Sequence, residues 1–231
     1  MARKQHRSWL LCEDRRTERF VRRICERYHI QVMPPDVSPR GKGAASAWVL
    51  RNYAALVRKR RSKSFQANLG LLVVIDGDNV GVKARLQQLE EELDHAGAER
   101  RGASEPIAIF VPTWSVETWL AHLCGTSDVD EATPMKDDGK ARALWGDGTR
   151  EAATIKTAVA AWSGSSTQLP SLQAAYDEAP KVGLDTTRYP FAAGKNAKIF
   201  VVAKKTASQW DVDPTLVDVS NDGANSVAFV A

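Results

Sequence analysis

The chain has 231 residues, of which 43% are hydrophobic and 26% are charged, and this balance excludes a chain that is disordered throughout. No apolar run is long enough to cross a bilayer, and the apolar part of the N-terminal region is too short for a signal peptide, so we expect a cytoplasmic protein with no membrane partner. The three cysteines are scattered and form no CxxC pair, which argues against a disulfide framework and a zinc site.

Charge is distributed unevenly along the chain. Residues 1–65 contain 17 Lys and Arg against 5 Asp and Glu, a net charge of +12, whereas the remaining residues contain 15 against 23, a net charge of −8. A basic half beside an acidic half is typical of a protein that contacts a polyanion on one side. A solvated helix face would explain part of the same pattern.

The first predicted element is a short strand followed by a basic helix. The apolar run from Ser8 to Cys12 predicts a buried strand that delivers Glu13 and Asp14 at its carboxyl end. From Thr17 onward, apolar residues recur at helical spacing while arginines occupy the other side. The pattern predicts an amphipathic helix with an arginine face.

The next segment contains a second strand and a second basic helix. Residues 29–33 are predicted to form a strand that ends at Pro34 and Pro35, since proline has no N–H to extend the ladder. Residues 36–44 are a loop by composition, and helical spacing of apolar residues predicts a helix over 45–57. The end of this helix is strongly basic, with Arg58, Lys59, Arg60, Arg61 and Lys63. Five basic residues in six positions exceed what helix capping needs and favour a phosphate-contacting patch over a solvated end.

The central stretch is Leu69 to Gly81, LGLLVVIDGDNVG. Five consecutive apolar residues lead into Asp76 and Asp78, which predicts a strand that is buried on both faces and ends in a polar loop. Residues at i and i+2 of an extended segment point the same way, so the two carboxylates repel each other unless a cation or a proton lies between them. In the alternative interpretation, Asp76 caps the strand and Asp78 or Asn79 caps the following helix.

Two more helices and a fourth strand complete the predicted core. An acidic amphipathic helix is predicted from Val82 to near Gly97. Residues 107–111 are predicted to form a buried strand, and Ser115 is the expected N-cap of the next helix. Alternating strands and helices predict an α/β fold in which a parallel central sheet is flanked by helices.

The pattern weakens beyond residue 125. Residues 154–162 and 172–179 are predicted to be helical and residues 197–203 to form a strand, whereas the tail from residue 206 has no pattern that we can interpret. We therefore expect a first domain over residues 1–182, with a core (8–125) and a helical extension (126–182), and a C-terminal extension over 183–231 with one or two strands.

Acidic side chains follow three of the predicted strands. Glu13 follows the first, Asp76 and Asp78 follow the third, and Glu117 lies just after the fourth, so all four should emerge at the carboxyl edge of the sheet. Hard oxygen ligands suit Mg²⁺ or Mn²⁺, which hold phosphate oxygens and activate water. In the alternative interpretation, Glu13 faces solvent and Glu117 is a first-turn helix acid favoured by the helix dipole.

A phosphodiester backbone is the natural substrate for such a site beside an arginine-rich face. We expect a basic flank, formed by the first two helices, to contact DNA or RNA through Arg19, Arg23, Arg58, Arg60 and Arg61. Lys83 is a further candidate for phosphate contact, although a surface position without a role is the simpler interpretation.

The motifs resemble those of the Toprim domain. A glutamate after the first strand and a DxDxxG-like motif after a later one are matched by Glu13 and by Asp76-Gly-Asp78-Asn-Val-Gly81. The segment EDRRTE, residues 13–18, looks like the EGxxTE opening of a small nuclease-like branch related to the OLD-family nucleases. PTWSVETWL at residues 112–120 is similar to the PxxxxExWL segment of that branch, and LPSLQAA at residues 169–175 resembles its late helix.

The resemblance covers most of residues 8–180. It implies a Toprim-like fold, a divalent metal and phosphoryl transfer on DNA or RNA, often in bacterial anti-phage defence and beside an ABC- or SMC-like ATPase partner. By matching positions, Glu13, Asp76 and Asp78 would hold the metal, and Glu117 would be a further ligand or a support. Asp14 departs from the pattern, because the branch usually has glycine there, and an extra acid would add charge to the site or crowd it.

We predict a metal-dependent endonuclease, with three competing interpretations. VVIDGDNV also fits a haloacid-dehalogenase-like phosphatase, with Asp76 as nucleophile, Asp78 as acid/base and downstream acids at Lys136-Asp137-Asp138. NYN/PIN-like ribonucleases have a similar IDGDN opening. Both motifs belong to the first strand of their folds, whereas two strands and two helices precede the motif here. The third interpretation is a non-catalytic Toprim module that binds nucleic acid or a partner.

Overall fold

The computed structural model describes residues 6–39, 45–135, 143–146, 148–162 and 167–184, together with the backbone of two strands at 200–205 and 210–218. The chain divides into two units, residues 1–188 and 189–231, and each is described by itself. The predicted boundary lay at residue 182. No helix in the described part of the chain is long and apolar enough to span a membrane.

The first unit is built on a parallel sheet with the strand order β2-β1-β4-β5, comprising β2 (Gln31–Val32), β1 (Arg7–Cys12), β4 (Leu69–Val74) and β5 (Ile107–Phe110). A further short strand, β3 (Asp36–Val37), also pairs with β1. The register of β1 and β4 runs from Arg7 opposite Leu69 to Cys12 opposite Val74. These two strands therefore end side by side, and the residues that follow them emerge at one place.

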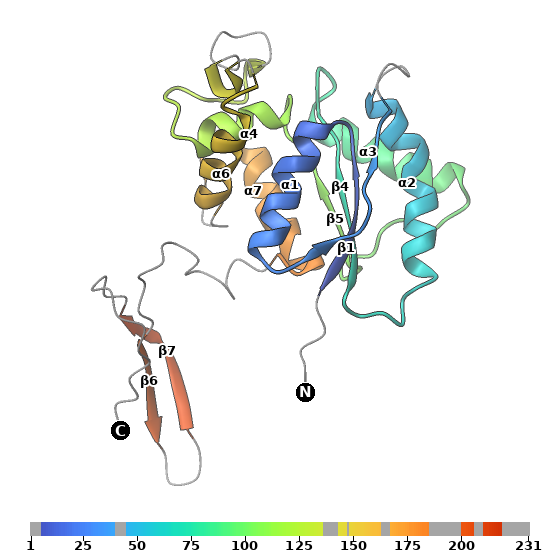
Figure 1. Ribbon diagram of the computed structural model, residues 1–231. Helices are drawn as coiled ribbons and strands as arrows, with labels where there is room; N and C mark the ends of the chain where they lie inside the picture. The colour runs from blue at the N-terminus through green and yellow to red at the C-terminus, as the bar shows by residue number, and fades with distance from the viewer. Residues whose placement is uncertain are drawn as a thin grey trace. The chain divides into compact units, whose positions relative to one another are not determined.

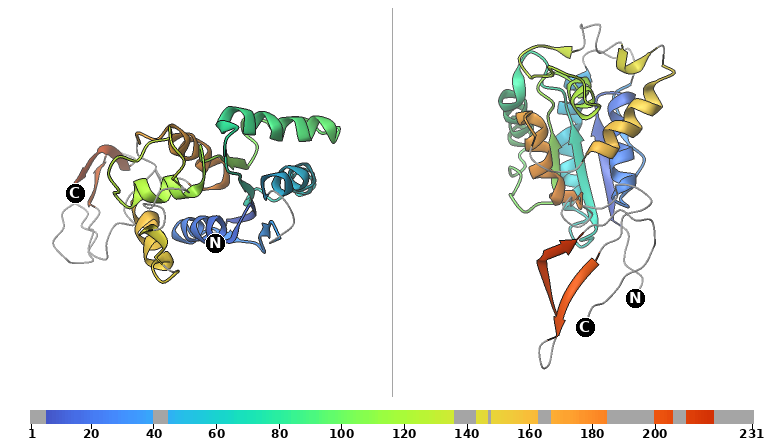
Figure 2. Two further views of the ribbon diagram at one scale, coloured as in Figure 1. Left: turned by 90° about the horizontal axis from the view of Figure 1, so that it is seen from above. Right: turned by 90° about the vertical axis from the view of Figure 1, so that its left-hand side faces the viewer.

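Helices cover both faces of this sheet (Figures 1 and 2). We call the first face the one covered by α1 (Arg15–Arg27), α4 (Val116–Leu123), α6 (Glu151–Ala161), α7 (Pro170–Glu178) and the 3₁₀ turn η2 (Ala179–Val182). The second face is covered by α2 (Ala45–Arg61) and α3 (Gly81–His95). The predicted α/β fold with a parallel sheet flanked by helices is confirmed.

Strand alternation divides one set of apolar residues between two cores. In β4, Leu72 and Val74 pack on the first face, whereas Leu71 and Val73 pack on the second. Successive side chains of a strand point to opposite faces, so a continuous apolar run is the pattern that a strand covered on both sides requires. The central strand was predicted from this pattern.

The second predicted strand is shorter than expected. Residues 29–33 were predicted to form one strand, but only the two residues of β2 pair with β1, and β3 resumes the pairing after Pro34 and Pro35. Neither proline has an N–H to donate, so the two divide the segment into short strands.

The second unit contains an antiparallel pair, β6 (Phe200–Lys205) and β7 (Trp210–Asp218). Part of the strand predicted over 197–203 therefore appears as β6, and residues 197–199 lie outside the described residues. The sequence analysis allowed for a second strand in this extension but did not place β7. Its sequence, WDVDPTLVD, alternates apolar and polar residues from Trp210 onward, but Pro214 and the aspartates obscure that period.

Candidate functional site

Glu13 and Asp76 meet at the carboxyl edge of the sheet. Glu13 follows β1, Asp76 lies two residues after β4, and the backbone N–H of Asp76 donates a hydrogen bond to Oε1 of Glu13 at 2.9 Å. Both side chains are buried, with exposed fractions of 8% and 4%. The carboxylate of Glu13 therefore lies against the backbone of Asp76, and this approach follows from the matched ends of the two strands.

A close approach of two loops fixes the backbone between the two aspartates. The N–H of Gly77 donates to the carbonyl of Pro112 at 2.8 Å, and the N–H of Asp78 donates to the carbonyl of Trp114 at 3.1 Å. A Cβ atom at residue 77 would lie 2.3 Å from the carbonyl oxygen of Thr113, so only glycine fits there. The loop after β5 thereby holds the loop after β4 in place.

Asp78 differs from Asp76 in conformation and exposure. Its φ of 46° lies in the left-handed region, which non-glycine residues seldom adopt and which often marks a functional loop. Its side chain is 44% exposed and lies 3.5 Å from the guanidinium of Arg85. The motif therefore presents one buried and one accessible carboxylate.

Arg85 is a buried arginine at this edge that the sequence analysis did not single out. Its Nε donates to the carbonyl of Asp76 at 2.9 Å, and its Nη2 donates to the carboxylate of Asp78 at 3.5 Å. The signal was present in the sequence, because residue 85 falls within the apolar stripe of α3, one turn from Val82 and one turn from Leu89. A charged residue in such a stripe is buried only when it has partners.

Glu117 is buried in the first turn of α4. The guanidinium of Arg16 on α1 lies 3.4 Å from its Oε1 and packs over the ring of Trp145 at 4.5 Å. Arg16 also reaches Glu151 at the start of α6, at 3.9 Å. Arg16 therefore links Glu117 to a second carboxylate on the first face, a contact that the sequence analysis did not anticipate.

Burial and neighbouring carboxylates shift the pKa values of two acids at this edge. Burial, followed by the charges of Glu13, Glu117, Asp14 and Asp78, raises the pKa of Asp76 well above its usual value. Burial also raises the pKa of Glu13 to about 7, although the hydrogen bond from Asp76 opposes this rise. Perturbed pKa values of this kind gather at functional sites, because catalytic and metal-binding carboxylates are desolvated and face like charges.

Asp14 has a structural role at the start of α1. Its carboxylate accepts hydrogen bonds from the backbone N–H groups of Arg16 and Thr17 at 2.7 and 3.0 Å, and from the hydroxyl of Thr17. This is the geometry of a helix N-cap, which satisfies N–H groups that lack a partner within the helix. The acid that stands in place of the expected glycine is exposed and bound to the helix end, and its charge still raises the pKa of Asp76.

No protein-family model matches this chain, and no curated protein or solved structure matches it either. The resemblance to the Toprim domain therefore remains a prediction that rests on the sequence motifs.

The residues fit a hard divalent cation by their chemistry, although their side chains are not gathered around one point. Within the described ranges, no three His, Cys, Asp or Glu side chains form a group that could hold a metal ion as they stand. Glu13, Asp76 and Asp78 are nevertheless oxygen donors on one edge, and the two buried ones have raised pKa values. A cation at this edge would offset the charge that raises them.

The predicted nucleic-acid contacts do not form one flank. The prediction that the first two helices form one basic flank was wrong, because α1 and α2 pack on opposite faces of the sheet (Figure 2). Arg60 is only 4% exposed, and Arg61 binds Glu105 through two nitrogens at 2.7 and 2.9 Å. Arg58 donates to the carbonyl of Ala96.

The other predicted basic contacts are accessible. Arg19 pairs with Glu151, Arg23 pairs with Glu26 at 2.8 Å, and both arginines are exposed. Lys83 is exposed on α3. The proposed downstream acids of a phosphatase, residues 136–138, lie outside the described residues.

Proposed function

We propose that this protein is a divalent-metal-dependent nuclease that hydrolyses phosphodiester bonds of DNA or RNA. The observation that carries the proposal is the pairing of Glu13 with the backbone of Asp76 at the matched ends of β1 and β4. Two buried carboxyl groups with raised pKa values are costly to keep in a fold, and a role in binding a cation explains them.

Mg²⁺ or Mn²⁺ would be held by Glu13, Asp76 and Asp78, and would supply Lewis-acid stabilisation of a phosphate and a more acidic water. Arg85 holds the Asp76–Asp78 loop through its bonds to both residues. Asp78 presents its carboxylate to solvent, where a phosphate group can approach. Glu117, held by Arg16, supports the site from α4.

The biological setting follows from the resemblance alone. Small Toprim nucleases of the branch that the motifs resemble often act in bacterial anti-phage defence, beside an ABC- or SMC-like ATPase partner. We propose the same setting for this chain, in the cytoplasm. A purified protein that is inactive until such a partner is added would agree with this part of the proposal.

Cleavage assays test the proposed activity. Plasmid DNA and single-stranded RNA are incubated with the protein and Mg²⁺ or Mn²⁺, with and without EDTA, beside Asp76→Asn. The control variant Asp177→Asn removes one exposed carboxylate from α7, outside the site. We expect cleavage by the wild type and by the control, and none by Asp76→Asn or in EDTA.

Cleavage by Asp76→Asn at the wild-type rate would contradict the proposal. A non-catalytic module would instead bind nucleic acid equally well in EDTA. It would cleave under no condition, even with an ATPase partner added. A phosphatase would hydrolyse p-nitrophenyl phosphate and leave both nucleic acids intact.

A further inference from the structure

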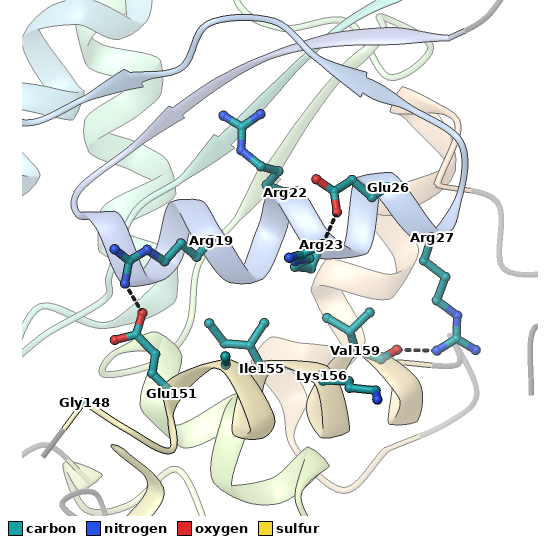
Figure 3. Close-up of a pocket in the computed structure, with 11 residues that line it drawn as sticks. Arg19, Arg22, Arg23, Glu26, Arg27, Gly148, Glu151, Ile155, Lys156 and Val159 are labelled. Atoms are coloured by element: carbon teal, nitrogen blue, oxygen red, sulfur yellow. Dashed lines mark hydrogen bonds and ion pairs between the residues drawn. The ribbon is translucent and has the colours of Figure 1, made fainter. Parts of the chain in front are cut away.

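A groove lies between α1 and α6 on the first face, outside the acidic edge (Figure 3). Its volume is about 850 Å³, which is within the range of pockets that hold ligands. Ile155 and Val159 of α6 form an apolar part of its wall. The charged residues of its lining are five cations against two acids, comprising Arg19, Arg22, Arg23, Arg27 and Lys156 against Glu26 and Glu151.

Three of these arginines form a line along α1. Arg19, Arg23 and Arg27 recur every fourth residue, which places them on one side of the helix, whereas Arg22 points away from α6 (Figure 3). At 1.5 Å per residue the line is about 12 Å long, which corresponds to the rise of three or four nucleotides of one strand. The spacing therefore suits a linear anion with repeated charges better than a single phosphate.

Arg19 and Arg23 can exchange their present partners for a phosphate, whereas Arg27 donates a hydrogen bond to the carbonyl of Val159. The side chains of Arg19 and Arg23 are 60% and 67% exposed in their ion pairs with Glu151 and Glu26. The Arg23–Glu26 pair is exposed at both ends, and exposed pairs contribute little to stability, whereas Glu151 is only 14% exposed in its pair with Arg19. Lys156 is exposed on α6 at the border of the groove.

A chain of contacts joins the groove to the acidic edge. Glu151 binds Arg19 inside the groove and also lies 3.9 Å from Arg16, which in turn contacts Glu117 at 3.4 Å. A second cavity of about 550 Å³, lined by Arg15 and Arg19, lies at the same end of α1. Arg16 and Arg19, one turn apart on α1, therefore link this end of the groove to Glu117 through Glu151.

We propose that the groove between α1 and α6 binds the sugar-phosphate backbone of one nucleic-acid strand and leads it to the acidic edge. The inference rests on the proposed nuclease function for what happens at that edge, but the binding step stands without it. A single strand is favoured because the groove has the volume of a ligand pocket between two helices, whereas a duplex would contact only its borders.

Binding is measured by fluorescence anisotropy of a labelled single-stranded oligonucleotide in EDTA, so that cleavage cannot interfere. Lys156→Glu reverses one charge in the groove, and Arg51→Glu makes the same change on α2, whose exposed surface lies on the second face. We expect Lys156→Glu to weaken binding about tenfold and to reduce the slope of log affinity against log salt by about 0.7. Arg51→Glu should change neither quantity.

Equal weakening by the two variants would overturn the inference, because it would show attraction by total charge alone. Tighter binding of duplex than of single strand, with the same loss in Lys156→Glu, would overturn the single-strand assignment. Equal competition by polyglutamate would identify a groove for acidic peptides. Groove-dependent binding by a protein that never cleaves would refute the nuclease function and support the groove.

Discussion

The two faces of the sheet are built from the same strands but differ in what they contain. The first face has an aromatic core, in which Trp162 packs against Phe20, Phe110, Trp119 and Tyr176 at ring distances of 4.7 to 6.4 Å. The second face is covered by α2 and α3 over a mainly aliphatic core, and the outer side of α3 is acidic. The groove and its line of arginines lie on the first face.

The two faces share the apolar residues of the strands and differ in the charged residues of their helices. Strand alternation supplies apolar residues to both faces equally, so the sheet itself does not decide where a ligand binds. The helices make the difference, because α1 lines the groove of the first face with arginines. On the second face, α3 carries carboxylates, and α2 is basic but has Arg60 buried and Arg61 paired with Glu105. The acidic edge lies between the two faces, where strands from the middle of the sheet end.

The largest expected effect concerns the aromatic core of the first face. Trp162→Ala should lower the free energy of unfolding by about 3–5 kcal/mol, because it leaves a cavity between four aromatic rings. Urea denaturation followed by circular dichroism measures the loss. A loss below about 1 kcal/mol would show that α6 is an appendage of the sheet and not part of its core.

The loop at the edge should be the next most sensitive position. Gly77→Ala places a methyl group 2.3 Å from the carbonyl oxygen of Thr113, and the backbone must move to relieve the clash. We expect a loss of about 1–3 kcal/mol in the free energy of unfolding together with loss of cleavage. Gly81→Ala is the matched change in the same loop. A Cβ at residue 81 meets open space, and the variant is strained only by its φ of 80°. Unchanged cleavage in both variants would contradict the role of the loop.

Glu13 should make stability depend on pH in the absence of metal. Its pKa rises from 4.5 to about 7 on folding, so its contribution to stability is fully present below pH 4.5 and is lost as the pH rises to about 7. Glu13→Gln keeps an oxygen for the N–H of Asp76 and should be more stable than wild type above pH 7, by up to about 3 kcal/mol. Denaturation in EDTA across this range measures the effect, and parallel curves for the two proteins would refute it.

The smallest expected effect separates the helix cap from the site. Asp14→Ala removes the acceptor for the N–H groups of Arg16 and Thr17 and should cost about 1 kcal/mol of stability. The lost negative charge should also lower the pKa of Asp76. Asp14→Asn keeps the acceptor and loses the charge, so thermal denaturation of the two variants separates the contributions. Equal losses in both would show that charge, not capping, explains the residue.

The types of the elements and most of their positions along the chain were predictable, because each depends on local spacing of apolar residues. The order of the strands in the sheet was not predicted. The approach of Glu13 to Asp76 was predictable too, since parallel strands that end together bring their next residues together. The sequence analysis did not identify Arg85, whose burial depends on the loop that it binds. It also placed Arg19 and Arg61 on one flank, because periodicity gives the buried side of a helix but not the face of the sheet that the helix covers.

Glu131 is a second residue whose role could not be predicted from local sequence patterns, because its partners are distant in the chain. It accepts hydrogen bonds from the hydroxyl of Thr113 at 2.8 Å and from the N–H of Ser171 at 3.1 Å, and thereby ties the loop after β5 to the start of α7. Nothing in the polar segment around residue 131 indicates this role. Contacts between segments with no shared period become visible only in the folded chain.

Mn²⁺ binding is the most direct test of the central claim that the carboxyl edge holds a divalent cation. Electron paramagnetic resonance measures free Mn²⁺ as it is titrated into the wild type, into Asp76→Asn and into the control Asp177→Asn. We predict one site in the wild type and in the control, with affinity that falls below pH 7 as Glu13 takes up a proton, and loss of that site in Asp76→Asn. Equal Mn²⁺ binding by all three proteins, or none by the wild type, would contradict the account.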